Sequence, residues 1–211
     1  MNNNVEVIIK RLKKAFPKAR IALKYERPID LLVATILSAQ CTDKRVNLVT
    51  KELFEKYRSA EDYANADLKE FENEIRSCGF YHNKARNIIN SAKIIVRDFG
   101  GKVPGNMNDI LTLPGVARKT ANIVLGNAYG IVEGIAVDTH VLRISARLGL
   151  TKQSDPVKIE QDLMKIVPGK EWLHFSYLLQ SLGRTVCFAR NPNHRACVLL
   201  DLCPFARVSE I

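Results

Sequence analysis

The sequence predicts an all-α fold, and three observations lead to this prediction. Apolar residues recur at helical spacing in nearly every segment, and one continuous apolar stripe runs through residues 81–99. Helix boundaries are marked by residue type: Gly100 and Gly101 end that segment, and Asp155 followed by Pro156 opens another. No run of alternating apolar and polar residues between turns indicates a strand.

The expected helices follow one another with short connections. Val5, Ile8, Ile9 and Leu12 form the apolar stripe of the first one. The full set comprises residues 5–16, 28–38, 44–57, 68–77, 81–99, 108–113, 118–129, 139–148, 156–166 and 172–187. Residues 130–134, with a glycine at each end, are expected to cross between two helical lobes. The second lobe then carries a C-terminal metal-cluster loop.

Bulk composition limits the classes of protein that fit. The chain has 211 residues, 46% of them hydrophobic, which suffices for one large core or two small ones. The net charge of +10 favours a polyanionic partner such as nucleic acid. Residues 1–20 lack the continuous apolar core of a signal peptide, and the apolar run 31–37 is too short to cross a bilayer. We therefore expect a cytoplasmic protein without membrane attachment.

The segment Leu-Pro-Gly-Val at residues 113–116 predicts a tight turn that joins two short helices as a helix-hairpin-helix. Turn amides and the N–H groups at a helix start attract anions, so this segment suits a DNA phosphate. Lys119 is expected in the first turn of the second helix, where the helix dipole, together with burial, favours a neutral and nucleophilic amine. Alanine at position 117 keeps its backbone N–H but resists a positive φ, so the contact of Ala117 with phosphate should survive provided that this residue is already helical.

The five cysteines are an odd number in a chain without a secretory signal, which does not fit a disulfide framework. Cys187, Cys197 and Cys203 lie close together in sequence near the C-terminus, and this clustering indicates a metal site. Cys41 and Cys78 stand apart in the sequence. We interpret both as small packing residues.

Together these motifs resemble the endonuclease III family of DNA repair enzymes. The matching segments are ATILSAQCTD at 34–43, GFYHNKA at 79–85, LPGVARKTAN at 113–122, IAVDTHVLR at 135–143 and the terminal cysteines. The resemblance implies a bifunctional DNA glycosylase and AP lyase of base excision repair. Such an enzyme excises oxidised pyrimidines from double-stranded DNA and cuts the strand at the abasic site by β-elimination. It is expected to act as a monomer at the prokaryotic nucleoid, because one active site requires no symmetry.

The resemblance also implies residue roles and a domain division. Lys119 is implied to form a Schiff base with the sugar. Asp138, otherwise an ordinary helix N-cap, is implied to stabilise positive charge on the sugar or to move protons. Gln40 and Phe80 are implied to fill the gap left by the flipped nucleotide, although core packing is the alternative for Phe80. Further DNA contacts are implied for Gly115, Ala117, Arg118, Thr120, His140 and Arg143. The implied domains are a six-helix barrel with the hairpin at 22–132, and a second helical domain with the cluster loop at 1–21 plus 133–211.

In the resembled family, four cysteines hold a [4Fe–4S] cluster with six, two and five residues between successive ligands. Cys187, His194, Cys197 and Cys203 keep this spacing, but the second position is a histidine. We expect a [4Fe–4S] cluster with His194 as the fourth ligand, because imidazole ligates cluster iron in Rieske centres. A zinc site is the runner-up, and a cluster on three cysteines or a group of free thiols also remains open. The cluster would be structural and would hold a loop whose Arg184, Arg190 and Arg195 meet phosphate.

Two other functions fit parts of the pattern. A mismatch-specific monofunctional DNA glycosylase of the same superfamily would generally lack the hairpin lysine. A non-catalytic helix-hairpin-helix DNA-binding protein would need the turn and the positive charge, but not Lys119 and Asp138 together. Strand cleavage at an abasic site separates the leading hypothesis from both alternatives.

Overall fold

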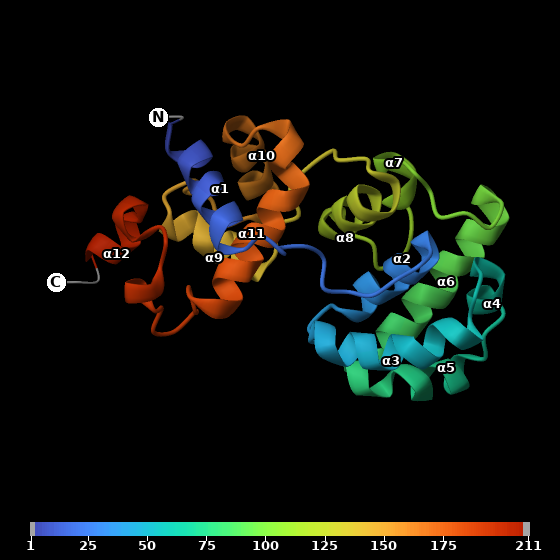
Figure 1. Ribbon diagram of the computed structural model, residues 1–211. Coiled ribbons are helices and arrows are strands. Elements are labelled where there is room, and N and C mark those ends of the chain that lie inside the picture. The colour runs from blue at the N-terminus through green and yellow to red at the C-terminus, as the bar shows by residue number, and fades with distance from the viewer. Residues whose placement is uncertain (1–2, 209–211) are drawn as a thin grey trace. The chain divides into compact units, whose positions relative to one another are not determined.

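The computed structural model describes residues 3–208, and over these residues it contains twelve α-helices and no strand. The prediction of an all-α fold is confirmed. The chain divides into two compact units, Ile21–Glu133 and Met1–Arg20 with Gly134–Ile211 (Figure 1). The N-terminal helix and the segment from Gly134 onward therefore share one unit.

The unit Ile21–Glu133 is built around α2 (Pro28–Leu37), whose residues Ile29 to Leu37 are all buried. Three helices pack against α2: α3 (Asp43–Lys56), α6 (Tyr81–Phe99) and α8 (Arg118–Val124). The remaining elements of this unit are α4 (Ala60–Ala64), α5 (Leu68–Ile75), the short 3-10 helix η1 (Arg76–Cys78), α7 (Met107–Ile110) and the π-helical turn η2 (Leu125–Tyr129). An almost wholly apolar helix such as α2 is stable in water only when other helices surround it.

The second unit is organised around α11 (Trp172–Thr185), which packs against α1 (Asn3–Ala15) and α9 (Thr139–Arg147). Its core contains the predicted stripe of α1, namely Val5, Ile8, Ile9 and Leu12. The other elements are α10 (Pro156–Ile166), η3 (Gly169–Glu171), η4 (His194–Ala196), η5 (Leu200–Leu202) and α12 (Pro204–Val208). The cysteine-rich segment thus consists of short helical turns that pack at the edge of this core.

Helix ends follow the local signals in the sequence. α6 ends at Gly100, which adopts a left-handed conformation at φ 58°, and Asp155 accepts hydrogen bonds from the N–H groups of Val157 and Lys158 at the start of α10. The predicted helix 118–129 is wrong in one respect: regular α-helix ends at Val124 and continues as a π-helical turn. The sequence analysis missed α4, a helix of five residues.

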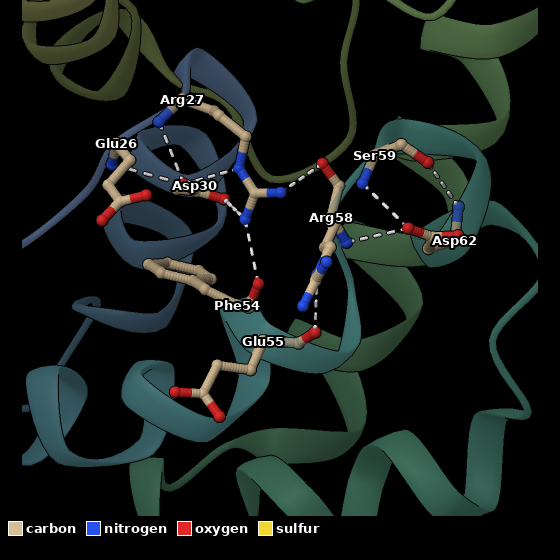
Figure 2. Close-up of polar contacts among 8 residues, drawn as sticks. All are labelled: Glu26, Arg27, Asp30, Phe54, Glu55, Arg58, Ser59 and Asp62. Carbon is tan, nitrogen blue, oxygen red and sulfur yellow. Dashed lines mark hydrogen bonds and ion pairs between the residues drawn. The ribbon is translucent and has the colours of Figure 1, made fainter.

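A buried ion pair stabilises the junction of α2, α3 and α4 (Figure 2). The Arg27 guanidinium lies 2.9 Å from the carboxylate of Asp30, whose side chain is fully buried. The same guanidinium donates hydrogen bonds to the carbonyls of Phe54 and Arg58 at the end of α3. The N–H of Arg58 in turn donates to Asp62 in the first turn of α4. Arg27 therefore joins the start of α2 to the end of α3, and Arg58 continues these contacts to α4.

No helix in the described part of the chain combines the length and apolar character needed to cross a membrane.

Candidate active site and nucleic-acid interface

The predicted hairpin is present as a β-turn of residues 113–116. The N–H of Val116 donates to the carbonyl of Leu113 at 3.1 Å, and Gly115 has φ 78°, as the third residue of a type II turn requires. A Cβ at position 115 would lie 2.8 Å from Nδ2 of Asn87. Glycine is thus required here by backbone conformation and by space. The Oγ of Ser91 on α6 donates to the carbonyl of Pro114 and anchors the turn.

Ala117 is the N-cap of α8, so the condition that it be already helical is not met. Its backbone is extended, at φ −95° and ψ 171°, and its carbonyl accepts from the N–H of Ala121. A negative φ carries no penalty for alanine, so a second glycine is unnecessary at this position. The first N–H groups of α8 follow directly from the turn, and such groups have no intrahelical acceptor.

Lys119 is the second residue of α8, as predicted, but its side chain is exposed. The expectation that this side chain is buried is therefore wrong for the described structure. Arg118 and Thr120, on either side, are half-buried. The amine of Lys119 is accessible to a large substrate.

Asp138 is the N-cap of α9. Its carboxylate accepts hydrogen bonds from the N–H groups of His140 at 2.9 Å and Val141 at 2.8 Å. The side chain is only partly buried, so it keeps contact with solvent while both backbone bonds hold it in one orientation. Lys119 belongs to the unit Ile21–Glu133 and Asp138 to the other unit.

Gln40 and Phe80 stand out in the backbone, because each has a positive φ without being glycine: 53° for Gln40 and 49° for Phe80. Both side chains are exposed, Phe80 by 64%. Core packing of Phe80 is thereby excluded. Non-glycine residues in the left-handed region are uncommon and carry a cost, so the surrounding structure must hold them there.

One buried lysine connects the two loops that carry Gln40 and Phe80. Lys84 on α6 is 5% exposed, and its Nζ donates to the carbonyls of Leu37 at 2.8 Å and Cys78 at 2.9 Å. Leu37 ends α2 and Cys78 ends η1. Burial lowers the pKa of Lys84, against the opposing effect of the Cys41 and Cys78 thiols. The sequence analysis missed this residue, since a lysine on a helix is normally a surface residue.

Two arginines one turn apart on α9 hold the cysteine-rich segment. Nη2 of Arg143 donates to the carbonyl of Cys187 at 3.0 Å and lies 3.1 Å from Nδ1 of His140. Nη1 of Arg147 donates to the Cys187 thiol at 3.2 Å and to the carbonyl of Phe188 at 2.7 Å. Arg143 thus has a structural role in the free protein, and DNA contact by Arg143 and His140 stays a prediction. The sequence analysis missed Arg147.

The four predicted metal ligands line one cavity, together with Arg147, Phe205 and neighbouring residues. Cys187, His194 and Cys197 are half-buried and Cys203 is buried. Burial raises the pKa of the Cys197 thiol, and the neighbouring Cys187 and Cys203 thiols raise it further. Within the described residues, no three His, Cys, Asp or Glu donors are arranged so that they would hold one metal ion as they stand.

The three arginines expected to meet phosphate are exposed: Arg184, Arg190 and Arg195. Arg184 lies in the last turn of α11, Arg190 precedes His194 by four residues, and Arg195 directly follows it. Positive charge therefore accompanies the cysteine-rich segment on the surface, as a DNA-binding loop requires.

The comparisons with known proteins agree with this architecture. The family model described as "HhH-GPD superfamily base excision DNA repair protein" matches residues 33–169. Endonuclease III of Synechocystis sp. is 54% identical over 198 residues, which cover 94% of this chain and 90% of that protein. The chain belongs to the endonuclease III family. Endonuclease III of Bacillus subtilis is 45% identical, over 94% of this chain and 91% of its own length.

Solved structures of endonuclease III have the same fold. A trapped endonuclease III–DNA covalent intermediate matches with a TM-score of 0.95 at 42% identity, covering 100% of this chain and 99% of that one. A non-covalent endonuclease III–DNA complex matches with a TM-score of 0.94 at 42% identity, covering 100% of this chain and 98% of that one. Endonuclease III proteins typically carry a [4Fe–4S] cluster, and the C-terminal cysteines are present in this chain.

Proposed function

We propose that this endonuclease III homologue is a bifunctional DNA glycosylase and AP lyase, which removes oxidised pyrimidines and cuts the strand by β-elimination. The observation that carries the proposal is Lys119: an accessible lysine in the first turn of α8, directly after the Gly115 turn. The 54% identity to an endonuclease III supports it, as does the likeness to endonuclease III structures in complex with DNA.

In the proposed reaction, the neutral amine of Lys119 attacks C1′ of the sugar while the bond from C1′ to the damaged base breaks. The sugar ring then opens, and the nitrogen and C1′ form a protonated Schiff base. The positive nitrogen withdraws electrons, so the proton on C2′ becomes acidic. Loss of that proton expels the 3′ phosphate and cuts the strand.

Asp138 would act through its charge. The carboxylate is held by two backbone N–H groups, so it is oriented before substrate arrives. A fixed negative charge stabilises the positive charge that develops on the sugar as the base departs, and the same group can accept and return protons. Its role as N-cap of α9 is compatible with this, because a carboxylate oxygen accepts more than one hydrogen bond.

Gln40 and Phe80 would fill the space that the flipped nucleotide leaves in the duplex. Both side chains are exposed, and the backbone of both residues is held in the left-handed conformation. An aromatic ring replaces lost base stacking at about 1–3 kcal/mol per base, which offsets part of the flipping cost of a few kcal/mol. The two loops are tied to each other through Lys84, so both groups would enter the duplex from one place.

The hairpin would bind the DNA backbone. Backbone N–H groups follow one another from Gly115 to Thr120; that of Val116 closes the turn, and the others suit a phosphate oxygen. Gly115 lets the backbone approach closely because it has no side chain. Arg118 would add charge, and His140 and Arg143 would contribute from α9.

The C-terminal cavity would hold a [4Fe–4S] cluster with Cys187, Cys197, Cys203 and His194 as ligands. Three thiols and one imidazole are suitable donors, and all four line the same cavity. When bound, the cluster would supply a structural cross-link for residues 187–203. Zinc is the runner-up, since three cysteines and one histidine also form a common zinc ligand set.

A strand-cleavage gel tests the function directly. A duplex with a single abasic site should be cut efficiently, and one with an oxidised pyrimidine should show base release followed by cleavage. A monofunctional glycosylase would release the base and leave the strand intact, and a binding module would do neither. Either of these two results overturns the proposal.

A further inference from the structure

Cys41 and Cys78 lie beside the two residues proposed to enter DNA. Cys41 directly follows Gln40, and Cys78 precedes Phe80 by two residues. α3, which begins just after Cys41, packs against η1, which ends at Cys78. The sequence gives no reason to pair two cysteines so far apart in the chain, but the fold brings their segments into contact.

The two thiols are neighbours in the structure. Burial raises the pKa of Cys78 to about 11, and the charge of the Cys41 thiol and a hydrogen bond with it contribute to the increase. Cys78 is 2% exposed, whereas Cys41 is half-buried. Both are free thiols. Cys41 is therefore accessible to a small reagent, whereas Cys78 is shielded from solvent.

Lys84 fixes this arrangement. Its Nζ binds the carbonyls of Leu37 and Cys78, so one ammonium group joins the end of α2 to the end of η1. The positive charge also acts on both thiols. At Cys78 burial outweighs this charge, so Cys41, the half-buried member of the pair, is the thiol that an oxidant reaches first.

We propose that Cys41 and Cys78 are a redox modification site, at which a peroxide forms a reversible disulfide between the two loops. The Cys41 thiol attacks the peroxide, which breaks the O–O bond and gives a sulfenic acid; the leaving oxygen takes the thiol proton and departs as water or an alcohol. The Cys78 thiol then displaces the sulfenic oxygen as water and forms the S–S bond. Overall, two thiols lose two electrons and two protons to one peroxide.

The consequence for DNA rests on the proposed roles of Gln40 and Phe80. A disulfide one residue from Gln40 and two from Phe80 would restrain both loops at their bases. Opening the duplex around a flipped nucleotide requires the Gln40 and Phe80 side chains to adjust their positions to the DNA. We expect lesion DNA to bind about tenfold more weakly to the oxidised protein, a loss comparable with that of one stacked aromatic ring. A thiol reductant restores the affinity.

Peptide mass spectrometry of peroxide-treated holoprotein tests the disulfide without reference to activity. Trypsin places Cys41 in the peptide 25–44 and Cys78 in the peptide 77–84, separate from the three C-terminal cysteines. The expected result is one linked pair of these peptides, which disappears after reduction and is absent in Cys41→Ser. Oxidation of Cys41 to sulfinic acid with no linked peptide would overturn the proposal.

Binding of an abasic-site duplex, followed by fluorescence anisotropy, tests the consequence. Wild-type protein should lose affinity after peroxide and regain it after reduction, whereas Cys41→Ser should be insensitive. A linked peptide with unchanged affinity overturns the effect on DNA. If the reduced protein neither binds nor cleaves lesion DNA, the proposed function fails, while the mass-spectrometric result stands by itself. Should Cys41→Ser fold poorly, Cys78→Ala serves as the second variant.

Discussion

The guanidinium of Arg27 lies 2.9 Å from the fully buried carboxylate of Asp30, and it also donates to the carbonyls that end α3. Asp30 accepts from the N–H groups of Glu26 and Arg27 at the start of α2. One ion pair thereby closes the start of one helix and the end of another. This junction positions the central helix of the unit that carries the hairpin.

Removing one partner of this pair should strongly destabilise the protein. Asp30→Asn removes the buried carboxylate but leaves the partly exposed Arg27 guanidinium with its two carbonyl acceptors, so the expected loss of unfolding free energy is about 1–3 kcal/mol. Chemical denaturation of the wild type and the variant measures it. The matched control is Asp98→Asn, which removes an exposed carboxylate paired with Arg97 and should change stability little. Equal losses of unfolding free energy in Asp30→Asn and Asp98→Asn would contradict the claim that burial of Asp30 makes its ion pair important for stability.

Gly115→Ala should destabilise the hairpin by more than the cost of placing alanine at a positive φ. The new Cβ would meet the Asn87 side chain and would also sit at φ 78°. Gly130→Ala is the matched control, because φ is 69° there but no atom lies within 4 Å of the new Cβ. We expect about 1–2 kcal/mol of destabilisation for the control. Gly115→Ala should lose more stability than Gly130→Ala, which chemical denaturation measures. It should also lose most of its affinity for duplex DNA, which fluorescence anisotropy measures. Indistinguishable variants would contradict the role of Asn87.

Phe80→Ala should weaken binding to lesion DNA and leave folding intact. The ring is 64% exposed, so its loss should hardly change the melting temperature. Binding should weaken by about 1–3 kcal/mol, or about 5- to 150-fold, if the ring stacks in the duplex. Leu48→Ala is the control, since Leu48 is 58% exposed and lies on α3, outside the two loops that carry Gln40 and Phe80. A drop of several degrees in melting temperature for Phe80→Ala would instead favour a structural role.

The sequence predicts the helices well where local chemistry determines them. Gly100 and Asp155 mark helix ends because a left-handed cap and a side-chain N-cap depend on neighbouring residues only. α4 has its own signal, a capping box of Ser59 and Asp62, but five residues are too few for a periodic pattern. Tertiary contacts determine the helix boundaries that have no such local signal.

The candidate site illustrates the same division. The Gly115 turn and the cysteine spacing can be predicted from the sequence, since each is a local motif. The exposure of Lys119 and the left-handed backbone at Gln40 and Phe80 depend on how distant segments meet. No local signal predicts that Lys84 is buried, because only the fold supplies its two carbonyl acceptors.

His194 can be tested through the metal content of the protein. Protein purified without oxygen should be brown and contain iron and sulfide, and His194→Cys, which restores four thiolates, should keep the cluster at a lower reduction potential. Spectroscopy, metal analysis and electrochemistry check these points. A colourless wild-type protein with one zinc ion would contradict the iron–sulfur assignment.

Borohydride trapping of Lys119 tests the central claim most directly. Reduction of a Schiff base fixes the protein covalently on DNA with an oxidised pyrimidine or an abasic site, and denaturing electrophoresis detects the product. Wild-type protein and Lys69→Ala, which removes an exposed lysine on α5, should both be trapped. Lys119→Ala should fold normally and give no trapped product, and peptide mapping should place the adduct on Lys119. Efficient trapping of folded Lys119→Ala would contradict the account.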